Sequence, residues 1–91
     1  MTEETEKRID ELYKNLFDYL EELKELSLTG DRQKSKELFT QYVKDSNELG
    51  ELLIQEGKDA GQIDAKLEKE IRDRQKILNI ETEERLSGLW S

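Results

Sequence analysis

The stretch ELSLTGDRQKS, residues 25–35, places one glycine between two amphipathic segments. Gly30 stands where a helix commonly ends in the left-handed conformation. Asp31 beside it is a preferred N-cap residue, with Thr29 as the competing choice. A second glycine-bearing turn spans residues 57–61, and the chain contains no proline. Two short turns between segments of nearly equal length predict antiparallel helices that lie side by side.

The first segment has a heptad pattern of apolar residues, which predicts a helix over about residues 3–28. Its apolar positions recur at spacings of three and four, at Ile9, Leu12, Leu16, Tyr19, Leu23 and Leu26. Tyr13, Phe17 and Leu20 widen this stripe on one side. The helix therefore has enough apolar surface to contact two neighbours, as a bundle requires.

The second segment predicts a helix over about residues 31–56 that ends at Gly57. Its inward stripe passes through Ser46 and Gly50. Because both residues are small, a neighbouring helix can approach closely, although a glycine inside a helix costs up to about 1 kcal/mol relative to alanine. We therefore expect either a tight helix contact at Gly50 or a bend.

The third segment predicts a helix over about residues 60–87, with Asp59 and Gln62 at the spacing of a capping box. Its apolar stripe is thinner than that of the first segment, and the polar residues 74–75 interrupt it. The polar sequence around Asn79 either breaks the helix or lies within it. Matching the lengths of the three helices favours a continuous one.

Together the segments predict an all-α chain with a single domain over residues 1–91. We expect an antiparallel up-down-up three-helix bundle with coiled-coil-like packing. In this topology each core layer receives apolar residues from every helix, such as Leu12, Leu49 and Leu67 in one layer. This agreement favours the bundle. The alternative is a helical hairpin whose third segment completes a dimer.

The composition limits the chemistry available to the chain. It has no histidine and no cysteine, which excludes catalytic Ser-His-Asp and Cys-His arrangements, the usual zinc sites and disulfides. The glycine turns lack both the ligand pattern of a calcium loop and the ending of a phosphate-binding loop. Paired carboxylates would need a cleft, for which a small bundle has little room. We therefore expect no enzyme, no metal and no cofactor.

The charge balance favours a protein partner over nucleic acid or membrane. The formal net charge is −8, and residues 1–30 carry nine acids against four bases. Such a chain repels the nucleic-acid backbone. No apolar run approaches the length of a membrane span, and the acidic N-terminus is unlike a signal peptide. With no cysteine present, a cytoplasmic location is expected.

Two groups of apolar residues are candidates for a partner-binding site. Tyr13 and Phe17 either face the third helix or form an exposed patch for a partner or a second copy. Leu86, Leu89 and Trp90 either cover the open end of the bundle or act as an anchor in another protein.

These observations favour a non-enzymatic protein-binding module: a small acidic adaptor, export chaperone or regulator that binds a partner helix. One alternative is a self-assembling helical oligomer, such as a homodimer. Another is an acidic mimic of nucleic acid that inhibits a DNA-binding protein, suggested by the acids of the first segment.

Overall fold

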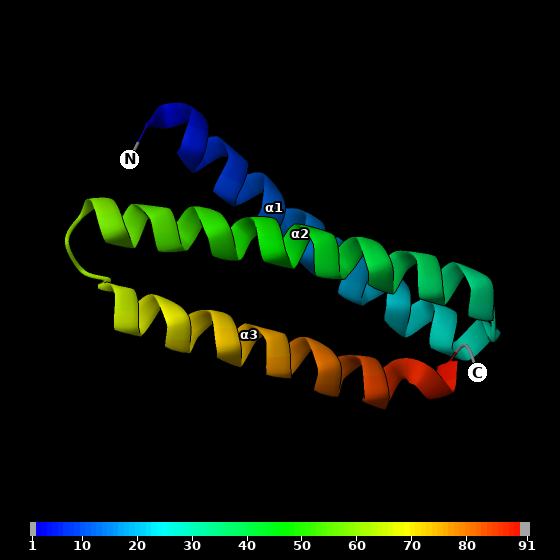
Figure 1. The fold of residues 1–91 in the computed structure, drawn as a ribbon. Coiled ribbons are helices and arrows are strands. Elements are labelled where there is room, and N and C mark those ends of the chain that lie inside the picture. Colours follow the sequence, from blue (N-terminus) through cyan, green and yellow to red (C-terminus); the bar gives the residue numbers. More distant parts are fainter. Residues whose placement is uncertain (1, 90–91) are drawn as a thin grey trace.

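The computed structural model describes residues 2–89, apart from the side chains of Leu86 and Leu89, and it is all-helical. Its helices are α1 (Glu3–Thr29), α2 (Arg32–Asp59) and α3 (Ala65–Leu86), and a short 3-10 helix, η1 (Ser87–Leu89), follows α3. Successive helices run antiparallel (Figure 1). The predicted all-α three-helix bundle is therefore confirmed, and α3 continues without a break through Asn79. Within the described range, no helix has the length and apolar character to cross a membrane.

The first turn forms as its sequence predicts. Gly30 adopts a left-handed φ of 76°, and its backbone N–H donates to the carbonyl oxygen of Leu26 at 2.9 Å. Asp31, rather than Thr29, is the N-cap of α2, because its carboxylate accepts the backbone N–H of Lys34 at 3.0 Å. Gly30 thus ends α1 and Asp31 starts α2. Because only these two residues connect the helices, α1 and α2 lie together as an antiparallel pair.

The second turn differs from the prediction at both helix ends. α2 continues past Gly57, and α3 begins at Ala65 instead of near residue 60. The left-handed conformation falls on Gly61, whose φ is 71°. Asp64 then caps α3 by accepting a backbone N–H of the first turn at 2.8 Å, so the predicted capping role of Asp59 is wrong.

The buried apolar core lies between α1 and α2. Leu12 is fully buried and packs with Ile9 and Leu49, and Leu16 and Leu52 surround this group. The other buried apolar side chains of the described residues are Leu23, Phe39 and Ile54, also from α1 and α2. The hydrophobic stabilisation is therefore concentrated in this helix pair.

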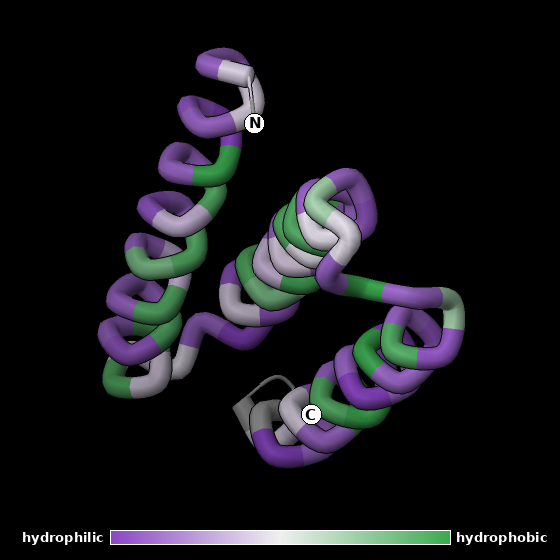
Figure 2. The backbone as a smooth tube through the Cα atoms, turned by 90° about the vertical axis from the view of Figure 1, so that its left-hand side faces the viewer, coloured by the Kyte–Doolittle hydropathy of each residue, from purple (hydrophilic) through white to green (hydrophobic). Residues whose placement is uncertain are grey.

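The third helix, α3, lies beside α2 and leaves the bundle open toward α1. The Cα atoms extend over 46 × 28 × 13 Å, and their radius of gyration is 15.1 Å, against about 12 Å for a compact domain of this length. Figure 2 shows the hydrophobic side of α1 turned inward toward α2, whereas hydrophobic residues lie on more than one side of α3. The expectation that every core layer includes the third helix is wrong, since Leu67 and Leu78 are 39% and 59% exposed.

Candidate protein-binding face

A buried carboxylate fixes α1 in register on α2. Asp45 is only 5% exposed. The hydroxyl of Tyr19 donates to one of its oxygens at 2.9 Å, and the side-chain amide of Gln41 donates to the other at 3.0 Å. Burial and the hydrogen bond to Asp45 raise the pKa of Tyr19. Because a buried carboxylate needs such partners, this contact sets which side of α1 packs on α2 and which side stays open.

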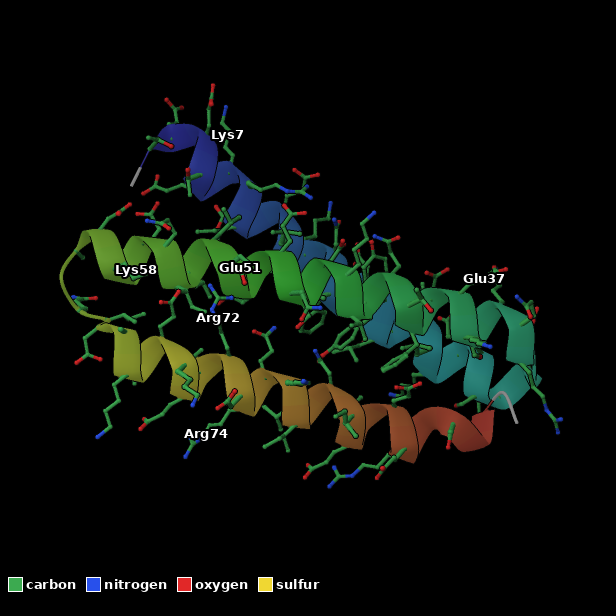
Figure 3. All side chains as sticks on the ribbon, in the orientation of Figure 1. Lys7, Glu37, Glu51, Lys58, Arg72 and Arg74 are labelled. Atoms are coloured by element: carbon green, nitrogen blue, oxygen red, sulfur yellow. The ribbon has the colours of Figure 1, made fainter. Side chains whose placement is uncertain are left out.

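Ion pairs hold α3 on α2 at the end near the second turn. Arg72 forms a bidentate pair with Glu51 across the two helices and pairs with Glu68 on α3 at 3.0 Å. Figure 3 shows the Arg72 and Glu51 side chains pointing toward each other between the helices. Lys58 of α2 adds a contact to Glu68 at 3.3 Å. The hydrogen bonds from Arg72 lower the pKa of both carboxyl groups.

Hydrogen bonds continue this polar contact along the helices. The side-chain amide of Gln75 donates to the carbonyl oxygen of Ser46 at 3.0 Å, and Asn79 donates to the side-chain oxygen of Asn47 at 3.2 Å. A methyl group added at Gly50 would overlap the Gln75 side chain. The expected tight contact at Gly50 is therefore confirmed, and it is a contact between α2 and a polar side chain of α3.

We expect the stability difference between the wild-type chain and Arg72→Gln to disappear in acid. Because the folded-state pKa values of Glu51 and Glu68 lie below 4.5, their ion pairs contribute stability above about pH 4.5. That contribution is lost as pH falls through the lower folded-state values. Thermal unfolding followed by circular dichroism between about pH 7 and pH 3 checks this. The difference in stability between the two proteins should be small at neutral pH, because exposed ion pairs contribute little. A difference that stays constant between these pH values would contradict the prediction.

The α1 side of the opening carries a stripe of large apolar side chains. Tyr13, Phe17 and Leu20 are 54%, 69% and 50% exposed, so the third helix does not bury the two aromatic residues. They follow one another at spacings of four and three residues, which places them along one side of the helix. The structure thus brings the two predicted aromatic residues together on an exposed surface.

The α3 side carries a matching stripe. Leu67, Ile71 and Leu78 recur at spacings of four and seven residues, beside the polar row that contacts α2. A groove runs between this stripe and α2, and its lining includes Tyr42, Ser46, Ile71, Arg74, Gln75 and Leu78. We call the surface formed by Tyr13, Phe17, Leu20, Leu67, Ile71 and Leu78 the open face. Leu20 extends the aromatic pair along α1, as the widened apolar stripe of that helix already indicated. The α3 residues Leu67, Ile71 and Leu78 join this surface only because α3 stays apart from α1, which sequence patterns did not indicate.

The predicted C-terminal group is not placed by the structure. The side chains of Leu86 and Leu89, and Trp90 as a whole, lie outside the described residues, so their roles as a cover or an anchor remain predictions. The backbone of η1 lies beside α2, near the turn that joins α1 to α2 (Figure 1).

The open face offers an apolar surface to a ligand. It consists of aliphatic and aromatic side chains, whose contribution to binding comes from burial. Among the residues that the structure describes, no group of three or more acidic residues is arranged to hold a metal ion. Comparison of the chain with protein-family models, with curated proteins and with solved structures finds no match.

Proposed function

We propose that this chain is a non-enzymatic, cytoplasmic protein-binding module that holds an amphipathic helix of another protein on its open face. The observation that carries the proposal is the exposure of Tyr13, Phe17 and Leu20 on α1, opposite the exposed leucines of α3. Exposed apolar side chains gathered on one surface are typical of interaction sites, and aromatic residues are common anchors in them.

The geometry of the open face fits a single helix. α1 and α3 lie on different sides of α2 (Figure 2), and each carries exposed apolar side chains. The proposed site is the side of α2 that remains between them. A helix lying there would contact all three helices, at the spacing of about 8–10 Å that packed helices adopt. It would complete a four-helix arrangement and remove both stripes from water. Helix-in-groove binding of this kind uses anchors at spacings of three and four residues.

A synthetic amphipathic helix tests the proposal. The probe is a peptide of about 21 residues with leucine at the heptad core positions and glutamine beside them, long enough to span the face. We expect it to bind the wild-type chain in fluorescence anisotropy. Phe17→Glu, which places a charge in the middle of the stripe, should weaken binding at least about tenfold, because burying an unpaired charge is costly.

Ile80→Glu is the matched control for Phe17→Glu. Ile80 is 49% exposed but lies about 180° around α3 from Ile71, on the side away from the open face. The control adds the same charge to the chain and should leave binding unchanged. Equal loss in both variants, or no binding to the wild-type chain, would contradict the proposal. Sedimentation of the free chain as a tight dimer would favour self-assembly instead.

A further inference from the structure

The charge around the open face comes from one helix. α1 carries nine acidic and four basic residues, a net charge of −5, whereas α3 carries six of each and is neutral. One of the four bases of α1, Arg8, is already paired with Glu48 and Glu11. The α1 side of the open face therefore belongs to an acidic helix, and its α3 side belongs to a helix with balanced charge.

Three exposed acids lie directly beside the apolar stripe of α1. Asp10 and Glu21 stand seven residues before and four residues after Phe17, and Glu6 stands seven before Tyr13. At about 100° per residue, all three lie on the same flank as these aromatic rings. None of the three forms an ion pair with another described residue. Their charges are thus available to a molecule that covers the stripe, only partly offset by nearby lysines.

A second copy of this chain is a poor match for such a surface. Each copy has a net charge of −8, so bringing two open faces together also brings two acidic α1 edges together. Like charges at a desolvated interface oppose association, and opposite charges promote it. The occupant that the charges favour is therefore not this chain but a helix with basic residues beside its apolar stripe.

We infer that the partner segment is a basic amphipathic helix, whose apolar stripe packs against Phe17 and the α3 leucines while its lysine or arginine side chains lie over Asp10 and Glu21. This inference rests on the proposed function. The apolar contact provides most of the affinity, and the basic flank selects among amphipathic helices. Lysine and arginine suit such an edge, because their aliphatic stems cover apolar surface while their charges reach the carboxylates.

Three peptides with the same leucine stripe test the inference, with lysine, glutamine or glutamate as the flanking residues. We expect binding to the wild-type chain in the order lysine, glutamine, glutamate. The lysine peptide should bind about tenfold more tightly than the glutamine peptide at low salt, and this gap should shrink at high salt. A lysine peptide with its leucines scrambled off one face should bind weakly.

Two double variants with the same net charge show which acidic residues cause the preference for the lysine peptide. Asp10→Asn with Glu21→Gln should remove most of the lysine preference. Asp18→Asn with Glu22→Gln should preserve it, since these acids lie about 100–140° around α1 from Phe17.

The outcomes separate this inference from the proposed function. Equal binding of the lysine and glutamine peptides, or equal loss in both double variants, would overturn the inference and leave the proposed function standing. Binding of the scrambled lysine peptide as tightly as the patterned one would also overturn it, by showing charge attraction alone. Failure of all patterned peptides would reject the proposed function itself.

Discussion

Leu12→Ala is expected to destabilise the chain by about 2–5 kcal/mol, a large part of the total stability of about 5–14 kcal/mol for a domain of this length. Leu12 is fully buried where α1 and α2 meet, against Ile9 and Leu49. Truncation leaves a cavity between α1 and α2. The helices cannot move together to fill it, because Leu16 and Leu52 are already packed at its edge. Thermal unfolding should show a midpoint lower by roughly 10–30 °C, or no cooperative transition.

Leu28→Ala is the control for this experiment, since it makes the same chemical change on the same helix. Leu28 is 86% exposed, so its truncation should alter the stability by no more than about 0.5 kcal/mol. Leucine and alanine are both good helix formers, so the difference between the two variants reflects mainly the burial of Leu12. Similar costs for the two variants would show that α1 and α2 do not pack as the structure describes.

The packing of α1 on α2 could be predicted from the sequence because both the period and the turn indicate it. The heptad pattern of α1 includes Leu12 and Leu23, two of its buried residues. Gly30 and Asp31 allow only a short connection, which forces the helices to lie side by side. Period, cap and turn thus favour the same arrangement, and such agreement makes a prediction from sequence secure.

The second turn was harder to predict because two capping residues compete in it. Asp59 and Asp64 both lie shortly before the third apolar stretch of the sequence, and residue type alone does not distinguish them as N-caps. The choice depends on backbone hydrogen bonds within the turn, where the N–H groups of Gln62 and Ile63 both donate to the carbonyl oxygen of Gly57. These bonds keep Gly57 within α2 and shift the start of α3 to Ala65.

The buried Asp45 was missed for a related reason. Charged residues are rarely buried, and the predicted inward stripe of α2 passed through Ser46 and Gly50 instead. The position of Asp45 in the sequence nevertheless indicated burial, because Tyr42, Asp45 and Leu49 follow a heptad pattern that faces α1. α2 thus has two packed sides, one apolar with a single buried carboxylate and one polar with small residues. A prediction that allows only one inward stripe cannot find both.

We expect amide hydrogens of α3 to exchange at least about 100-fold faster than those near Leu12 and Leu49, because α3 is held less firmly than the other two helices. Every buried apolar side chain of the described residues belongs to α1 or α2. α3 is attached through contacts such as Arg72 with Glu51 and Gln75 with Ser46, which exchange readily for contacts with water. Hydrogen exchange followed by NMR on the full chain checks this. Equal protection in all three helices would contradict it.

Gly50→Leu sharpens the test, because it acts on α3 without weakening α2. The leucine would occupy the space of the Gln75 side chain, so the protection of α3 should fall further. Leucine is also favoured over glycine inside a helix by up to about 1 kcal/mol, so the protection of α1 and α2 should stay equal or rise. Lys44→Leu, at an exposed position of the same helix, should not affect α3. A parallel loss of protection in all three helices would mean that α3 and the helix pair unfold as one unit, and that the open face is rigid. Loss confined to α3 would mean that this helix can move to admit a partner.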